Sequence, residues 1–177
     1  MKRKLNKLVF YTLKTLINFL VYFDSRRYML YYNRLLHFVG LNLTGTPRFI
    51  AKSVKFDDFN RITLGDRVVI SLNVYFLTHD YSFTTALISI GEQPQTDVGV
   101  LRNIIVGNNV FIGMNSIIMP GTTIGENVIV GAGSVVRVNI TSNSIVAGNP
   151  AAVIGDIKDY ALKIKTRENQ DFIIDKK

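Results

Sequence analysis

The sequence of 177 residues contains no cysteine and only two histidines, His37 and His79. Without cysteine the chain forms no disulfide, no thiolate metal site and no cysteine nucleophile. Two histidines are also too few for a three-histidine zinc site, so we expect no metal. Basic and aromatic residues are not combined in the pattern of a nucleic-acid interface, and we expect no nucleic-acid partner.

Acidic residues are scarce in the first 34 positions, where Asp24 is the only one. Eight Lys and Arg residues give this segment a net charge of +7, out of +8 for the whole chain. Its apolar residues recur at helical spacing, which predicts an amphipathic helix with a single apolar stripe. The stripe consists of Leu5, Leu8, Val9, Leu13, Leu16, Ile17 and Leu20.

Long apolar runs are missing as well. The stretch from Leu8 to Phe23 is interrupted by Lys14 and Asn18. It is also shorter than the roughly 20 apolar residues that a membrane-spanning helix needs. No small-residue cleavage site follows it, as a signal peptide would require. We therefore expect a cytoplasmic protein. Two interpretations of the basic helix stay open: it packs on the rest of the chain, or residues 1–34 contact anionic lipid at the inner face of the membrane.

A second helix is expected over residues 25–39, with Asp24 or Ser25 as its N-cap and Gly40 just past its end. Its tyrosines suit a core or a subunit contact better than an acceptor pocket. His37, on the same helix, is interpreted as a packed or surface residue outside any site.

The most informative pattern is a period of six residues between Val106 and Thr141, which belongs to neither a helix nor a simple strand. An aliphatic residue recurs at Val106, Ile112, Ile118, Ile124, Val130 and Val136. Small or β-branched residues follow four positions later, at Val110, Ser116, Thr122, Val128, Ser134 and Ile140. Residues that tolerate positive φ stand three positions later, at Asn109, Asn115, Gly121, Asn127, Gly133 and Asn139. Short strands joined by corners, with three six-residue sides to each turn, therefore form a triangular prism of parallel strands.

The same period is present earlier, at Leu64, Ile70 and Phe76, with Arg67, Asn73 and His79 at the expected corners. It stops from Asp80 to Asn103 and resumes at Val106, five whole repeats after Phe76. A long loop thus leaves the prism at a corner and returns in register, and loops of this length are usually functional or disordered. Residues 49–60 are interpreted as an imperfect first coil.

The run VGNNVFIGMNSIIMPGTTIGENVIVGAGSVV, followed by AGNPAAVI from Ala147, resembles the hexapeptide-repeat acyltransferases, in the branch of sugar and xenobiotic O-acetyltransferases. The resemblance covers about residues 62–157. It implies an all-β core folded as a left-handed parallel β-helix, with three chains that bind acetyl-CoA and acceptor in clefts between neighbours. The expected organisation is a basic helical segment at 1–45, the β-helix domain at 46–157 with a loop insertion at 80–103, and a C-terminal helix and tail at 158–177.

Acyl transfer to a hydroxyl needs a base for the hydroxyl proton and donors for the oxyanion. His79, in the segment Leu77-Thr78-His79-Asp80, matches the catalytic histidine of the resembling family and is the candidate base. The structural alternative is a histidine that tolerates a corner with positive φ. Asp80 is a candidate for holding the imidazole tautomer, with a backbone carbonyl as an equal alternative.

Two further residues, Asn73 and Tyr75, are candidates for binding the acceptor. Asn73 matches a family position that contacts the acceptor, although an Asn at a corner also has a purely structural explanation. Tyr75 and Phe111 occupy outward slots, where aromatic side chains call for a partner chain or a ligand over them.

By resemblance, the acetyl-CoA contacts fall on the later coils, at Phe111, Gly113, Met114, Gly131, Ala132, Arg137, Asn149 and Pro150. The glycines and Ala132 would let pantetheine lie along the backbone, and they serve the coil geometry equally well. Arg137 replaces a small residue in its slot and is the candidate partner of the CoA phosphates.

The function that the resemblance implies is an acetyl-CoA-dependent O-acetyltransferase that forms a homotrimer and acts on a sugar hydroxyl in surface polysaccharide biosynthesis. Acetyl-CoA is the co-substrate, and no metal is involved. Two alternatives stay open: acetylation of a small xenobiotic, and a non-catalytic β-helix that serves as a scaffold or binding module.

Overall fold

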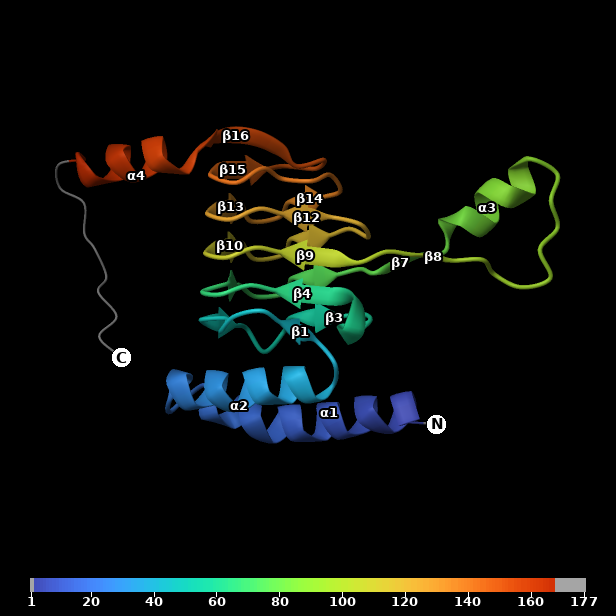
Figure 1. Ribbon diagram of the computed structural model, residues 1–177, viewed down its shortest axis with the longest axis horizontal. Helices are drawn as coiled ribbons and strands as arrows, with labels where there is room; N and C mark the ends of the chain where they lie inside the picture. Colours follow the sequence, from blue (N-terminus) through green and yellow to red (C-terminus); the bar gives the residue numbers. More distant parts are fainter. Residues whose placement is uncertain (1, 168–177) are drawn as a thin grey trace.

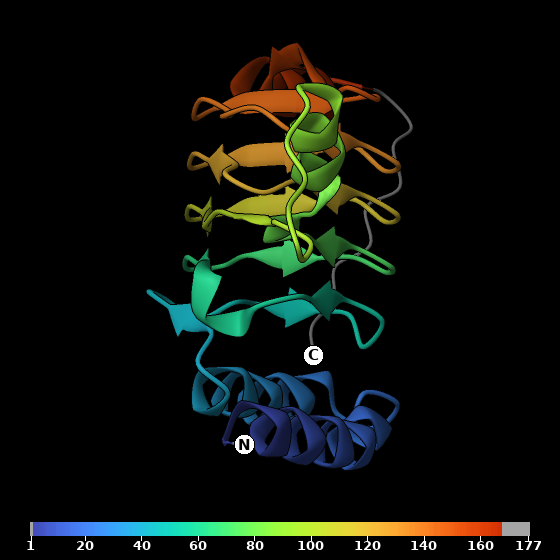
Figure 2. The same cartoon turned by 90° about the vertical axis from the view of Figure 1, so that its right-hand side faces the viewer.

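The computed structural model describes residues 2–167, and from residue 8 onward it also describes the side chains. The structure is a three-sided column of short strands, with α1 (Lys2–Leu20) and α2 (Ser25–Phe38) across its base and α4 (Ile157–Lys165) beside its top (Figure 1). An arm projects from the column between these ends (Figures 1 and 2). The expected N-terminal helices, β-helix, inserted loop and C-terminal helix are therefore all observed. The charged tail expected beyond residue 167 lies outside the described residues.

Three sheets form the sides of the column, and we name each after its first strand. The β1 sheet contains β1 (Asn42–Leu43), β4 (Ile62–Leu64), β9 (Ile104–Val106) and β12 (Thr123–Ile124). The β2 sheet contains β2 (Phe49–Ile50), β5 (Val69–Ile70), β10 (Val110–Ile112), β13 (Val128–Val130), β15 (Ser144–Ala147) and β16 (Ala152–Asp156). The β3 sheet contains β3 (Lys55–Phe56), β6 (Tyr75–Phe76), β11 (Ile117–Ile118) and β14 (Val135–Val136). Neighbouring strands are parallel except for β15 and β16.

The arm interrupts the column without changing its register. A hydrogen bond between Asn109 and Asn127 joins side chains 18 positions apart, which is one regular turn. The corresponding bond between Asn73 and Asn115, on either side of the arm, spans 42 positions. The difference equals the length of the excursion expected from the sequence. The arm consists of β7 (His79–Asp80), α3 (Ser82–Ser89) and β8 (Val100–Leu101), and β7 pairs with β8 in antiparallel fashion.

The interior of the column is filled by the six-residue repeat. The bulky positions, such as Ile112 and Ile118, are fully buried, and so are the small positions Ser116 and Ser134. Both serine hydroxyls donate to the carbonyl of Gly131, at 3.1 and 2.6 Å, so these polar groups are satisfied inside the core. Alternation of one bulky and one small inward residue thus sets the narrow cross-section of the column.

Most expected corners have the expected backbone conformation. Positive φ angles occur at Arg67, Asn73, Asn109, Asn115, Gly121, Asn127 and Gly133. The expectation was wrong for Asn139, because the positive φ of the last coil falls at Asn143. His79 is not a positive-φ corner either, since it begins an extended strand of the arm.

The first and last coils depart from the regular turn. In the last coil the hydrogen bond between Asn127 and Asn143 spans only 16 positions, and Ile124 forms a bridge with Ile140. Ile140 therefore fills a bulky slot and not the small slot expected for it. The first coil is longer than a regular turn, since the hydrogen bond from Thr44 to Leu64 spans 20 positions. The extra length includes a 3₁₀ turn at Phe59–Arg61.

The two N-terminal helices close the base of the column. Asp24 caps α2 by accepting hydrogen bonds from the backbone N–H groups of Arg26 and Arg27, both at 3.0 Å. The phenol of Tyr28 donates to the carbonyl of Ile50 at 2.8 Å, which ties α2 to the first coil. Phe10 of α1 is also buried in this contact region.

The apolar residues of α1 do not form the single stripe that the sequence pattern indicated. Val9, Ile17 and Leu20 are half-buried on the side that faces the protein, whereas Leu8 and Leu16 are exposed. The side chain of Leu5 lies outside the described set. Among residues 2–167, no helix is long and apolar enough to cross a membrane.

Candidate functional site

His79 lies where the chain leaves the column for the arm. Thr78, the preceding residue, is fully buried, and its backbone N–H and its hydroxyl donate to Asp57 Oδ2 and Asp58 Oδ2, each at 3.2 Å. The carbonyl of Thr78 accepts the N–H of Arg102 at 2.9 Å, where the chain returns. Hydrogen bonds to the first coil and to the returning end of the arm thus fix the position of the residue before His79.

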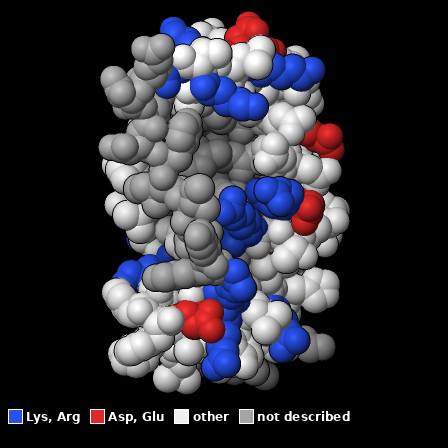
Figure 3. Space-filling model, turned by 90° about the vertical axis from the view of Figure 1, so that its left-hand side faces the viewer, with Lys and Arg blue, Asp and Glu red and all other residues white. Residues whose placement is uncertain are grey.

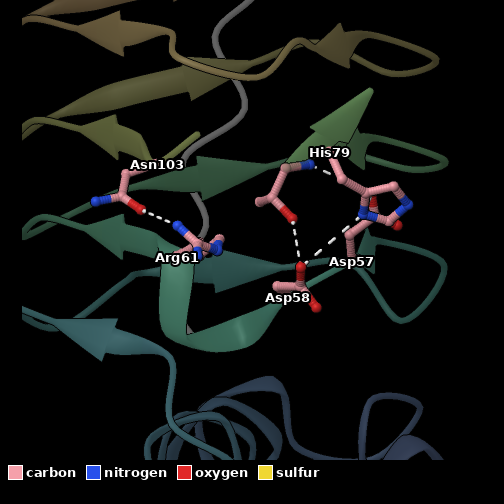
Figure 4. Close-up of polar contacts among 6 residues, drawn as sticks. Asp57, Asp58, Arg61, His79 and Asn103 are labelled. Atoms are coloured by element: carbon pink, nitrogen blue, oxygen red, sulfur yellow. Dashed lines mark hydrogen bonds and ion pairs between the residues drawn. The ribbon is translucent and has the colours of Figure 1, made fainter. Parts of the chain in front are cut away.

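The His79 imidazole is directed toward the same two carboxylates (Figure 4). Its Nδ1 lies 3.4 Å from Asp57 Oδ2 and 3.9 Å from Asp58 Oδ2. A carboxylate beside Nδ1 favours the tautomer that carries its proton there, which leaves Nε2 as a proton acceptor. The His79 side chain is 35% exposed, so the ring is accessible to a ligand. This is the arrangement that a general base requires.

Asp57 and Asp58 were not among the residues predicted from the sequence. They follow β3 directly, and β3 pairs with β6, so the two carboxylates lie one coil below the segment that leads to His79. Asp58 and Thr78, which share a hydrogen bond, are 20 positions apart, and the regular six-residue count would not have aligned them. The available signal was an adjacent pair of acidic residues at the end of a strand in the first coil.

Asp80 follows His79 in the extended strand β7, where successive side chains point to opposite faces. Its carboxylate accepts the N–H of Ser82 at 2.9 Å at the start of α3. Hydrogen bonding from Ser82 holds the pKa of Asp80 below its ordinary value, with smaller contributions from Arg102 and Arg137. The carboxylates within reach of the His79 ring are those of Asp57 and Asp58.

A cavity of about 300 Å³ lies between the base of the arm and the column. Arg102 and Arg137 contribute its positive charge, and Phe83, Ala86, Met119 and Pro120 are among its apolar residues. Arg137, the candidate for CoA phosphates, therefore lies with Asp80 at the arm's corner.

Other candidate residues lie at a different corner, between the β2 and β3 sheets. Asn73 is in the left-handed conformation there, and its Nδ2 donates to Oδ1 of Asn115 at 3.2 Å. Met114 lies in the next coil of this corner, and Gly131 and Ala132 lie in the coil after it. A Cβ on Gly113 would lie 2.5 Å from the backbone nitrogen of Ala132, so the coil itself requires this glycine.

The remaining candidates are surface residues of the column. Phe111 is 44% exposed on the β2 sheet, where it lines a groove of about 260 Å³ with Arg48 and Arg67. Tyr75 is exposed on the β3 sheet, and the ammonium group of Lys55 lies 5.6 Å from the centre of its ring. Asn149 and Pro150 are exposed in the turn between β15 and β16.

One chain therefore brings together His79, Asp80 and Arg137 at one corner, and Asn73, Gly113, Met114 and Ala132 at another. The β3 sheet lies between these corners, so the candidate residues do not converge on one cleft within a single chain. Within the described residues, no group of three or more His, Asp or Glu side chains is placed to hold a metal ion.

The column is the fold of the hexapeptide-repeat proteins. Residues 103–138 match the family described as bacterial transferase hexapeptide (six repeats). A galactoside acetyltransferase solved in complex with coenzyme A has the same fold, with a TM-score of 0.59 and 23% identity over 98% of this chain and 90% of that one. Residues 103–138 thus carry the hexapeptide repeat of that family, and the fold of the chain is the left-handed parallel β-helix.

The chain is also similar in sequence to curated proteins. Protein CapG of Staphylococcus aureus is 46% identical over 111 residues, which are 63% of this chain and 60% of CapG. The galactoside O-acetyltransferase of Escherichia coli K12 is 39% identical over 103 residues, which are 58% of this chain and 47% of that protein. The matched region thus spans about half to three fifths of these relatives.

Proposed function

We propose that the protein is an acetyl-CoA-dependent O-acetyltransferase in which His79 is the general base and the acceptor is a sugar hydroxyl. The observation that carries this proposal is the placement of His79, with Nδ1 beside Asp57 and an accessible ring at the base of the arm. The similarity to a galactoside O-acetyltransferase supports the choice of acceptor. A role in surface polysaccharide biosynthesis is the biological setting that we propose for this reaction.

In the proposed reaction, Nε2 of His79 takes the proton of the acceptor hydroxyl as its oxygen attacks the thioester carbonyl. Backbone N–H groups stabilise the oxyanion of the tetrahedral intermediate. The intermediate collapses with cleavage of the carbon–sulfur bond, and the thiolate of CoA takes the proton back from His79. The carboxylates of Asp57 and Asp58 stabilise the imidazolium between the two transfers.

Acetyl-CoA is the proposed co-substrate, and Arg137 is the proposed partner of its phosphates. A guanidinium group forms charge-assisted hydrogen bonds with phosphate oxygens. Phe111, Gly113, Met114, Gly131, Ala132, Asn149 and Pro150 stay proposed contacts of the remainder of the cofactor.

The division of these residues between two corners supports a homotrimer. If neighbouring copies pack side by side, the His79 corner of one chain meets the Asn73 corner of the next, and each cleft is complete only between chains. Ile117, Ile129 and Val135 on the sides of the column are half-buried apolar residues that such packing would cover.

The direct test is release of CoA from acetyl-CoA in the presence of a panel of sugars, nucleotide sugars and small xenobiotic alcohols, followed by mass spectrometry of the product. The proposal expects an acetyl ester on a sugar. Acetylation confined to the xenobiotics would show that the acceptor is a small xenobiotic and not a sugar. Absence of any transfer would favour a non-catalytic scaffold.

A further inference from the structure

The outer face of α1 carries the kind of side chain that normally lies inside a protein. Leu16 and Phe19 are 68% and 66% exposed, whereas Phe10, on the face toward the column, is only 2% exposed. The exposed set recurs every three to five residues and continues past the end of the helix. We call this set the α1 outer face: Leu8, Tyr11, Leu16, Phe19 and Phe23.

A lysine occupies the inner face of the same helix. Nζ of Lys14 donates to the carbonyl of Val54 at 3.2 Å and lies 5.5 Å from the ring centres of both Phe10 and Tyr32. Its burial and the nearby Lys55 lower the pKa of Lys14 to about 8. These contacts fix which side of α1 faces the column, so the apolar outer face is a consequence of the packing.

The surroundings of the outer face are basic. Residues 1–34 carry a net charge of +7, which leaves +1 for the rest of the chain. Arg26, Arg27 and Arg34 are exposed on the adjacent α2. In the view of Figure 3, Lys and Arg side chains lie along the whole height of the molecule, its base included.

The positive charge around the α1 outer face indicates what kind of surface can bind there. A second copy of the same face would bring +7 against +7, so self-association through it is disfavoured. An anionic bilayer satisfies both features, because apolar side chains insert at the headgroup boundary and basic residues are attracted by the lipid charge. We propose that the α1 outer face docks the protein peripherally on an anionic membrane surface.

The geometry of the fold suits this docking. Both helices lie across the base of the column, whereas the arm that carries His79 projects from its side (Figure 1). The docked protein would therefore keep the arm and its cavity open to solvent above the lipid surface. The inference does not depend on the proposed acetyl transfer, because none of the candidate site residues belongs to α1 or α2.

Because the sequence contains no tryptophan, a single introduced tryptophan can report insertion into a membrane. A Phe19→Trp variant of the full chain carries a single tryptophan on the outer face, and Tyr160→Trp places one on α4, where Tyr160 is 49% exposed. With vesicles of phosphatidylcholine and phosphatidylglycerol, the emission of Phe19→Trp should shift to the blue. Tyr160→Trp should not change. Equal shifts in both variants, or none in Phe19→Trp, would overturn the proposal.

Co-sedimentation with the same vesicles tests the charge and the apolar face separately. Each basic residue near an anionic surface contributes roughly a fivefold gain in affinity, so Arg26→Gln, Arg27→Gln and Arg34→Gln together should weaken binding roughly a hundredfold. The matched control is Lys158→Gln, Lys163→Gln and Lys165→Gln on α4, which should bind like the unchanged chain. Binding of the unchanged chain should also decline as salt rises.

The combined variant Leu16→Ser and Phe19→Ser should abolish sedimentation and keep the circular dichroism spectrum and oligomeric state of the unchanged chain. Equal binding to vesicles of pure phosphatidylcholine would contradict the role of the lipid charge. A change of oligomeric state in the serine variant, with no vesicle binding by the unchanged chain, would identify the outer face as a contact between copies and overturn the membrane proposal.

Discussion

Nδ1 of His79 lies 3.4 Å from Oδ2 of Asp57, a residue of the preceding coil. The contact depends on the stacking of β3 under β6, so the β-helix itself brings the pair together. Because the same carboxylate accepts the N–H of Thr78, Asp57 holds the peptide before His79 as well as facing its ring.

Asp57→Asn should lower kcat and leave the KM for acetyl-CoA within a few-fold, because the carboxylate orients the imidazole and does not contact the co-substrate. Loss of an orienting partner of this kind typically costs about tenfold to a hundredfold. Steady-state kinetics with both substrates measure the effects on kcat and on KM separately. Asp97→Asn, at an exposed position in the arm, is the control and should have no effect. A large rise in the KM for acetyl-CoA at unchanged kcat would show that Asp57 does not act through His79.

Arg137→Ala should weaken the binding of acetyl-CoA, because it removes a charge-assisted contact with phosphate worth about 1.5–3 kcal/mol, roughly tenfold to a hundredfold in Kd. Calorimetry with CoA and with pantetheine separates the phosphates from the remainder of the molecule. Only CoA binding should weaken. Arg26→Ala, an exposed residue of α2 away from the candidate site, serves as the matched control and should bind CoA normally. If CoA binds Arg137→Ala normally, the phosphates lie elsewhere.

Mixed oligomers test whether each cleft is built from two chains. His79→Asn and Asn73→Ala should each be impaired alone, because each lacks one half of every cleft. After denaturation together and refolding, some clefts would combine the intact His79 of one chain with the intact Asn73 of the next, and activity should recover in part. No recovery on mixing, or a monomer in analytical ultracentrifugation, would argue against shared clefts.

Lys14 should make stability depend on pH in a defined window. Its pKa is about 8 in the folded chain, below the ordinary value of 10.5, mainly because it is buried. Between these two values the unfolded chain binds more protons, so stability attributable to Lys14 should rise with pH from about 8 to 10.5. Urea unfolding of the unchanged chain and of Lys14→Met across that pH range measures this contribution to stability. A difference between the two proteins that stays constant with pH would contradict the burial of this ammonium group.

The middle of the column follows from the sequence because the six-residue period there is unbroken. Asn109, Asn115 and Asn127 mark corners that any residue with easy access to positive φ can form, and the register across the arm follows from counting whole repeats. At the two ends of the column the number of residues per turn changes. The last coil is shorter, which moves Ile140 into a bulky slot, and the first coil is longer, which hides the alignment of Asp57 with the segment before His79.

Helical periodicity likewise predicted α1 but not which of its faces packs. Leucines and aromatic residues stand on both sides of the helix, so spacing alone could not separate the inner contacts of Phe10 from the exposed set around Leu16. The deciding contact, from Lys14 to the carbonyl of Val54, joins residues 40 positions apart and requires the tertiary structure.

The measurement that tests the central claim most directly is the kcat of His79→Asn with acetyl-CoA and a sugar acceptor, alongside the Kd of acetyl-CoA. Loss of a general base costs about two to four orders of magnitude. The account expects a fall of that size in kcat, with the Kd within a few-fold of the unchanged protein. Near-normal turnover would contradict the role of His79 as the base, and loss of CoA binding would show that its role is structural.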